Sequence, residues 1–273
     1  MQETVIKPQR KLTINVAELF RYRELLFYFA WRDLKVRYKQ TFIGAAWAIL
    51  QPLISTVVFT VFFNKIVGIQ SGGNVPYAVF AFLGLMYWNL FSSSLMKASN
   101  SILDNQGVIT KIYFPRLIPP LSSGVLGLVD FCISVGFFGL ILLLYGISPG
   151  IFGILLLIPM AFVTLLASLG AGMFFAALNV KYRDIRQALP FMIQTLLFLT
   201  PVIYPVTLVP EKVQWILYLN PVCGVITLLR STILGLGSVR PLYLLISFSS
   251  AVLTFIIGIY FFRSKERGFA DII

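Results

Sequence analysis

The sequence predicts an all-α integral membrane protein: six transmembrane helices, an N-terminal amphipathic helix that does not cross the membrane, and short re-entrant helices between spans five and six. The chain of 273 residues is 58% hydrophobic, with a mean hydropathy of +0.88. Several uncharged apolar runs reach the ~20 residues that a helix needs to cross a bilayer. Lysine and arginine gather beside these runs, which sets the orientation of the chain. We expect one membrane domain, 1–273, with a tail and helix at 1–42, a six-span bundle at 43–262 and a tail at 263–273.

The segment Glu18–Gln40 is expected to form a helix in the plane of the membrane surface. On a helical wheel its apolar side chains form a narrow stripe with cations on both flanks, as in interfacial helices. The stripe consists of Phe20, Phe27, Trp31, Leu34 and Tyr38, and the cations are Arg21, Arg32, Lys35, Arg37 and Lys39. Leu25, Leu26 and Phe29 lie on the far side, so we expect the middle of the helix to lie between lipid and the bundle. A passive anchor is the alternative.

Six apolar segments are the candidate spans. They are Ile43–Ile66, Pro76–Met96, Leu121–Tyr145, Ile151–Leu178, Ala188–Val206 and Leu242–Phe262. With the N-terminus inside, 18 of the 22 lysines and arginines lie on the inner side and four on the outer side. Cytoplasmic loops carry the excess of cations in membrane proteins, so both termini are expected in the cytoplasm.

The segment Val213–Gly235 is apolar enough to resemble a seventh span. A seventh crossing would place Arg263, Lys265 and Arg267 outside, against the charge rule. Pro221 also disfavours helix at Asn220, in the middle of the segment. We therefore expect two short helices that enter the outer leaflet and return, and that line or cap a cavity.

The loop at 97–120 is expected to be the most structured cytoplasmic element after the N-terminal helix. Ser99 or Asn100 would cap a short helix through Leu103–Asn105, and Gly107 would end it. Apolar side chains follow in a segment that should be wet, which indicates a docking surface. They are Ile109, Ile112, Tyr113 and Phe114. A short helix packed on the membrane surface is the alternative.

Two further sites involve acidic side chains. Asp130 falls inside the third span, where an acid costs at least ~2.5 kcal/mol unless it is paired or hydrated, so a functional role and a hydrogen-bonded packing role both stay open. The loop Asn179–Gln187 holds Arg183 beside Asp184, for which a simple solvated pair is one interpretation.

Aromatic residues make up 15% of the chain, and many lie near the ends of spans. An interfacial belt explains most of them. A subset is expected to line a path or gate along which sugar rings move over flat apolar faces. The candidates are Phe59, Tyr87, Trp88, Phe198, Tyr204, Trp215 and Tyr218.

The composition excludes several classes of function. A net charge of +12 would suggest nucleic acid in a soluble protein, but these cations adjoin apolar runs, so anionic membrane lipids are the expected partner and nucleic acid is not. The chain has no histidine, and Cys132 and Cys223 lie in apolar surroundings, so no metal site is expected. It has no G-x-x-x-x-G-K-[ST] motif and no paired carboxylates, so no cofactor and no catalytic residue are expected. The first 18 residues are polar, so no cleavable signal peptide is expected.

Five segments in order along the chain carry a family resemblance. They are DLKVRYKQTFIGAAW at Asp33–Trp47, KIYFPR at Lys111–Arg116, LNVKYRDI at Leu178–Ile185, TPVIYP at Thr200–Pro205 and VPEKVQWILYLNP at Val209–Pro221. Each is weak alone. Together they resemble the ABC-2 type transport permeases, and within them the polysaccharide-export subfamily that serves O-antigen, capsule and teichoic acid.

The resemblance implies a homodimer in the bacterial inner membrane, served by two separate cytoplasmic ABC ATPase subunits that bind ATP and magnesium. The transport channel would lie at the dimer interface. The substrate would be a polysaccharide, foremost an O-antigen, on a polyprenyl-diphosphate lipid that moves from the inner to the outer face.

The resemblance also assigns roles to segments. Ser101–Gly107 would be the coupling helix that docks in the ATPase, with Ile109–Arg116 beside it. Glu18–Gln40 would be the interface helix, and Val209–Gly235 would form the periplasmic gate helices. The coupling candidates are Ser101, Ile102, Asp104, Asn105, Ile109, Lys111, Ile112, Phe114 and Arg116, and the candidates to hold the lipid diphosphate are Arg32, Lys35, Arg37 and Lys39.

Two alternatives remain at this point. One is an ABC-2 exporter of drugs or small lipids, which shares the architecture but carries a different cargo. The other is a membrane enzyme that acts on polyprenyl lipids, which would need clustered acids or histidines at a membrane face.

Overall fold

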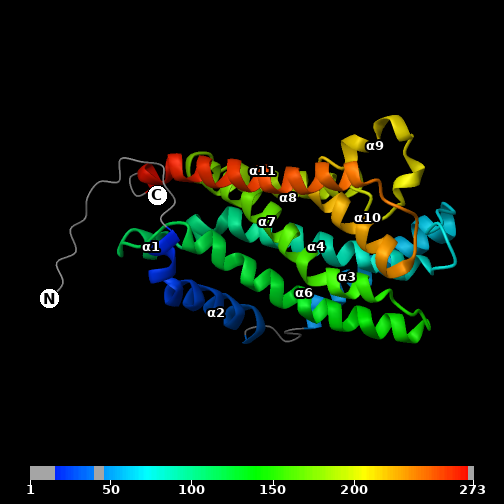
Figure 1. The fold of residues 1–273 in the computed structure, drawn as a ribbon. Helices are drawn as coiled ribbons and strands as arrows, with labels where there is room; N and C mark the ends of the chain where they lie inside the picture. Colours follow the sequence, from blue (N-terminus) through cyan, green and yellow to red (C-terminus); the bar gives the residue numbers. More distant parts are fainter. Residues whose placement is uncertain (1–15, 40–45, 270–273) are drawn as a thin grey trace.

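The computed structural model describes residues 16–39 and 46–269, and every regular element in these ranges is helical (Figure 1). The side chains of Lys39 and Arg267, the junction at Gly44 and the outer parts of both tails lie outside the described residues. Both described chain ends lie at one end of an elongated bundle, which we call the terminal end. The opposite end, which we call the far end, holds the segments 67–76, 145–150, 200–220 and 235–240.

Within residues 16–39 and 46–269, five helical segments are long and apolar enough to cross a membrane. The first is Ile49–Ile66, where α3 (Trp47–Phe59) continues into the π-helical turn η2 (Thr60–Ile66). The others are α4 (Tyr77–Asp104), α6 (Ile118–Leu144), α7 (Ile151–Lys181) and α11 (Pro241–Lys265). They correspond to predicted spans one to four and six.

The predicted fifth span differs from the observed helix. It was expected at Ala188–Val206, but α8 is Ile185–Leu199 and has only 15 residues. Thr200 is extended because it precedes Pro201, and this ends the helix before it reaches a full span. The count is five spanning helices, or six if α9 and α10 form one bent span, so the predicted arrangement of six spans stays a prediction.

The break at Asn220 is confirmed. The helices α9 (Glu211–Leu217) and α10 (Pro221–Leu234) meet at an angle of 113°. The Asn220 side chain accepts a hydrogen bond from the Val222 amide at 3.1 Å, which caps α10, and donates to Thr200 Oγ1 at 2.6 Å. Ten residues of α10 are buried against its neighbours, whereas α9 buries none.

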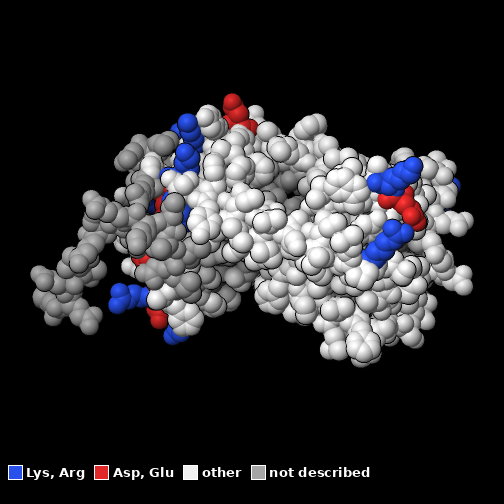
Figure 2. Space-filling model, turned by 45° about the horizontal axis from the view of Figure 1, so that its top comes forward, with Lys and Arg blue, Asp and Glu red and all other residues white. Residues whose placement is uncertain are grey.

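The core is centred on α4, which packs against α6 and α7 and contributes most of the buried aromatic side chains. The helices α7 and α11 approach so closely that a Cβ at Gly258 would lie 1.9 Å from the Gly170 carbonyl oxygen. On the face seen in Figure 2, charged side chains gather at the two ends, and the surface between them is uncharged. This distribution suits a bundle that crosses a membrane along its long axis.

The N-terminal helix is bent rather than continuous. It consists of α1 (Val16–Arg21) and α2 (Arg23–Lys39), with a turn at Tyr22, and α2 packs against α6. The predicted division of its faces holds for Phe20, Phe27 and Trp31, which are exposed, and for Phe29, which is buried. It fails for Tyr38, which was placed in the same stripe but contacts Asp130 of α6. The Phe29 ring lies 5.7 Å from the ring of Phe114, which attaches α2 to the loop before α6.

The structure contradicts the prediction of a separate short helix within 97–107. The helix α4 continues through this region to Asp104, and Gly107 lies inside the next helix, α5 (Gln106–Ile109), rather than ending one. Ser99 and Asn100 bond back to the Met96 carbonyl from within the helix, so neither side chain caps a new one. The proposed coupling helix Ser101–Gly107 is therefore the end of α4 and the start of α5.

Candidate functional site

Asp130 on α6 is bound from two sides by the C-terminal turn of α2. Arg37 Nη1 lies 2.6 Å from Asp130 Oδ2, and the Tyr38 hydroxyl donates a hydrogen bond to Oδ1 at 2.5 Å. Ser134, one turn further along α6, donates to the Asp130 carbonyl. The sequence left open a functional role and a protonated or hydrogen-bonded packing role for Asp130, and the structure shows both of its carboxyl oxygens engaged. Charge-assisted contacts of this kind offset the cost of taking the acid out of water.

The protonation state of Tyr38 supports this contact. Burial, and then the hydrogen bond to the Asp130 carboxylate, raise the pKa of Tyr38 above its usual range. The hydroxyl therefore keeps its proton at neutral pH and stays a donor. We call Arg37, Tyr38 and Asp130 the α2–α6 clasp.

The four cations proposed to hold a diphosphate have different surroundings. Arg32 contacts its neighbour Asp33 at 2.8 Å and lies over the Phe29 ring. Lys35 is exposed beside the Trp31 ring, and Arg37 belongs to the clasp. The Lys39 side chain lies outside the described residues. Arg32 and Arg37 are thus the two that face the bundle.

A cavity of about 530 Å³ opens beside Arg32 and Arg37 at the terminal end. Three helices line it with mostly polar groups, and Lys97 adds a third cation from α4. The lining residues are Arg32, Asp33, Val36, Arg37, Lys97, Ser101, Asp104, Asn105, Pro119 and Ser123. We call it the terminal cavity.

A second cavity of about 390 Å³ lies further into the bundle, between α3, α4, α6 and α8. We call it the inner cavity. Polar side chains line it at depths where the spans are otherwise apolar: Gln51, Ser55, Asn89, Ser92, Ser93, Asp130, Ser134 and Gln194. Arg37 lines both cavities, so the clasp lies where they adjoin. Apart from Asp130, sequence reasoning missed these groups, although uncharged polar residues within apolar spans are the signal that would have found them.

The aromatic residues proposed for a path are scattered. Trp88 is buried and lines the inner cavity. The proposal that Tyr87 lines a path is wrong, because Tyr87 is fully buried in the core and its hydroxyl donates to the Leu157 carbonyl at 2.7 Å. Phe59 packs on Phe63, and Tyr204 donates to the Leu199 carbonyl. Phe198 and Trp215 are exposed, while Tyr218 is buried at the far end.

The coupling candidates divide into buried and exposed groups. The prediction that Ile109 and Phe114 form part of an exposed docking surface is wrong, because both are buried in a cluster with Phe29. Ser101, Ile102 and Asn105 are buried as well, and Arg116 donates to the Glu266 carbonyl. The exposed candidates are Asp104, Lys111 and Ile112, and Tyr113 is exposed beside them.

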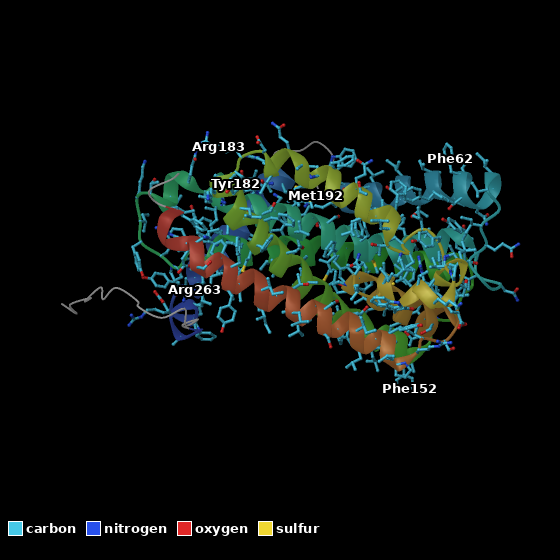
Figure 3. The ribbon with its side chains drawn as sticks, turned by 90° about the horizontal axis from the view of Figure 1, so that it is seen from above. Phe62, Phe152, Tyr182, Arg183, Met192 and Arg263 are labelled. Carbon is cyan, nitrogen blue, oxygen red and sulfur yellow. The ribbon has the colours of Figure 1, made fainter. Side chains whose placement is uncertain are left out.

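A second loop lies at the terminal end with these residues. Arg186 contacts Asp104 at 3.1 Å, which joins the end of α4 to the start of α8. The sequence suggested an ion pair between Arg183 and Asp184. The described ion pair of this loop joins Arg186 to Asp104 instead. Figure 3 shows Tyr182 and Arg183 at the same end of the bundle as Arg263, with Phe62 and Phe152 toward the other end.

No group of three potential metal ligands occurs among the residues that the structure describes. The two cysteines are free, Cys132 exposed and Cys223 buried. The described part of the chain offers two cavities between helices and an exposed surface at the terminal end.

Comparison with known proteins gives one family. Residues 24–234 match the ABC-2 type transporter family. The O-antigen export system permease protein RfbA of Myxococcus xanthus is 31% identical over 198 residues, which is 72% of this chain and 74% of the relative. A protein of the same name from Klebsiella pneumoniae is 27% identical over 264 residues, 96% of this chain and 99% of the relative. The polysialic acid transport protein KpsM of Escherichia coli is 24% identical over 185 residues, 66% of this chain and 70% of the relative.

We predict that Asp130 and Arg37 are energetically coupled. Asp130→Asn removes one charge of a pair whose side chains are only 14% and 28% exposed. Because partial exposure weakens the effect of breaking a buried pair, we expect a loss of ~1–3 kcal/mol in the free energy of unfolding. A double-mutant cycle with Arg37→Met, measured by unfolding in mixed micelles, should give a coupling energy of ~1–2 kcal/mol.

The matched control is Asp33→Asn, which breaks the contact between neighbours Arg32 and Asp33. This contact is more exposed, so its loss should cost less than ~1 kcal/mol. Equal effects of the two asparagine variants, or a coupling energy near zero, would show that the clasp does not hold α2 on α6.

Proposed function

This chain is a member of the ABC-2 type transporter family, a multi-pass membrane protein, and we propose that it is the transmembrane subunit of an ATP-driven exporter of polysaccharide. The cargo is a glycan linked to a polyprenyl-diphosphate lipid, foremost an O-antigen, which moves across the bacterial inner membrane. Relatives named as O-antigen export permeases support this choice.

The observation that carries the proposal is a pair of cavities that share Arg37 and carry polar side chains in their linings. The terminal cavity offers the cations Arg32, Arg37 and Lys97, and the inner cavity continues into the bundle with hydroxyl and amide groups. A lipid diphosphate needs cations at the membrane surface, where arginine binds phosphate oxygens bidentately and lysine acts as a point charge. A glycan needs hydrogen-bonding groups along its path, which an apolar bundle alone lacks.

The clasp lies at the entrance to that path. A phosphate in the terminal cavity meets Arg37, whose other partner is the Asp130 carboxylate. Phosphate and carboxylate compete for the same guanidinium. Release of Asp130 by a bound diphosphate would loosen α2 from α6 at the point where the two cavities adjoin.

Two copies of the chain are needed for the complete path. The inner cavity of one chain, at about 390 Å³, is too small for a polymer and is lined in part by α3. The α3 helix also exposes Ile54, Val57 and Val58, and Phe62 of η2 is exposed after them, so one face of this span has no partner within the described chain. A homodimer that joins two inner cavities gives a wider channel.

Energy comes from two ABC ATPase subunits on the cytoplasmic side, which supply the ATP and magnesium sites that this sequence lacks. The exposed residues Lys111, Ile112 and Tyr113 and the loop that carries Tyr182 and Arg183 are the surface on which we place them. The exposed side chains of Ile112, Tyr113 and Tyr182 beside mixed charges are typical of a docking surface.

The direct test reconstitutes the chain with its ATPase subunit in lipid nanodiscs. ATP hydrolysis should rise when a lipid-linked glycan is added and should change little with the free polyprenyl phosphate or with a hydrophobic drug. Cells that lack the chain should accumulate the lipid-linked glycan at the inner face. Stimulation by drugs or short lipids alone would favour the small-molecule exporter, and conversion of the lipid without the ATPase would favour a membrane enzyme.

We predict that Ile112→Asp separates the chain from its ATPase. Ile112 is 62% exposed, so the substitution should leave the fold intact. An unpaired charge buried in an interface costs several kcal/mol, so co-purification of the ATPase should fall ~100-fold or more. The control Ile112→Ala removes apolar area without adding charge and should have a smaller effect. Normal co-purification and export with Ile112→Asp would place the docking surface elsewhere.

We also predict that the terminal end faces the cytoplasm. In a Cys132→Ser background, a cysteine at exposed Ser264 should resist a membrane-impermeant thiol reagent in intact cells and react after permeabilisation. A cysteine at exposed Ser238, at the far end, should react in intact cells. The reverse pattern would invert the orientation that the cation count predicts.

A further inference from the structure

A third cavity, of about 330 Å³, lies at the far end and is separate from the two cavities of the proposed path. We call it the outer pocket. Four segments surround it: the turn at Ser71, the region from Pro205 to Tyr218, the inner face of α10 and the connection into α11. Figure 2 shows opposite charges close together at this end of the molecule.

Arg230 of α10 lines this pocket although it is almost fully buried. Its Nη1 donates to the Pro201 carbonyl at 2.7 Å, and its Nη2 donates to the carbonyls of Phe80 and Val202 at 3.0 and 2.5 Å. The buried Nε has no hydrogen-bond partner. Carbonyl dipoles offset the guanidinium charge only in part, because none of these partners is an anion.

One wall of the pocket is aromatic. The rings of Tyr218 and Tyr243 stack with their centroids 4.8 Å apart, and the Arg240 guanidinium lies 5.8 Å from the Tyr243 ring. Arg240 also contacts Glu211 at 3.2 Å, and both side chains are exposed. The pocket thus combines a flat apolar wall with two arginines and one acid.

Gln214 and Thr227 add polar groups to the lining. The Gln214 amide nitrogen donates to the Val209 carbonyl at 2.8 Å, which fixes the side chain in place. The Thr227 hydroxyl is held in a similar way by the Cys223 carbonyl at 2.7 Å. A pocket with fixed polar groups, an aromatic wall and this volume suits a small polar ligand with one flat face.

We propose that the outer pocket binds an acidic sugar unit, a pyranose ring that carries a carboxylate. The ring faces the aromatic wall, and the carboxylate lies toward Arg230 and Arg240, whose combined charge exceeds that of Glu211. The assignment to a sugar rests on the proposed function, whereas the preference for an anion rests on the two arginines.

The test measures binding of glucuronate, glucose and inorganic phosphate to the purified full-length chain in detergent, without ATP or the ATPase, by saturation-transfer NMR. Glucuronate should bind ~10-fold or more tightly than glucose, since one favourable charge contact contributes about 1–2 kcal/mol. Phosphate should displace glucuronate only weakly, because it lacks the ring.

The exposed ion pair between Arg240 and Glu211 allows two substitutions with opposite expected effects on the affinity for glucuronate. Arg240→Gln should weaken glucuronate binding ~3–10-fold, and Glu211→Gln should strengthen it by a similar factor, because it removes the acid that competes for Arg240. Neither change should alter the affinity for glucose. Lys65→Gln, which changes an exposed cation outside the pocket lining, is the matched control and should leave glucuronate binding unchanged. Arg230→Lys keeps the charge but removes the Nε donor, so it should weaken glucuronate binding and leave the affinity for glucose unchanged.

The outcomes separate this proposal from the proposed function. Equal binding of glucose and glucuronate, or no binding at all, would overturn the acidic-sugar site. A change of glucuronate affinity in the same direction for Arg240→Gln and Glu211→Gln would also overturn it. Phosphate that competes as well as glucuronate would make it a general anion site and would also overturn the proposal. Failure of the nanodisc export test with glucuronate binding intact would overturn the exporter and leave the pocket as a sugar site.

Discussion

The clasp between Arg37, Tyr38 and Asp130 is the contact on which the arrangement of the terminal half depends. The α2 helix has no covalent constraint that holds it along α6, and its outward face carries exposed Phe27 and Trp31. Two polar contacts to one carboxylate, together with the burial of Phe29, decide where its C-terminal turn lies. Because Arg37 lines both the terminal and the inner cavity, the same contact that positions the helix also separates the two polar spaces.

A comparable constraint operates at the far end, where α8 ends early and α9 and α10 meet at a sharp angle. Helix ends leave carbonyl groups without partners, and such groups are costly in an apolar surrounding. Arg230 donates to two carbonyls that follow α8 and to one on α4, so a single buried side chain satisfies the broken region. This explains why α10 is packed core rather than a movable element. By contrast, the described helices α9 and η3 (Val206–Leu208) at that end have no buried residue.

Sequence reasoning recovered what composition and charge determine. It predicted the all-helical membrane fold, five of the long helices, the break at Asn220 and the side of the N-terminal helix on which Phe29 is buried. It failed where tertiary contacts decide. Pro201 shortened α8, Ser99 and Asn100 bonded within α4 instead of capping, and Ile109 and Phe114 turned inward to meet Phe29. A pattern shows that Asp130 needs a partner, but only the packing of α2 on α6 identifies it as Arg37.

The choice of a carboxylate at position 130 has a consequence for the proposed transport cycle. A neutral asparagine there could also accept the Tyr38 hydrogen bond, and it would cost less to bury. It would compete poorly with a phosphate for Arg37, however, because only an anion offers the guanidinium a comparable interaction. With Asp130, the Arg37 guanidinium exchanges a carboxylate for a phosphate. The free-energy difference between the closed clasp and the phosphate-bound state is therefore smaller than the contribution of either contact alone. Near balance is the condition under which a bound ligand can shift a two-state element. In the proposed cycle, an acid inside a span, costly as a structural feature alone, would release α2 when the diphosphate arrives and recapture it when the diphosphate leaves.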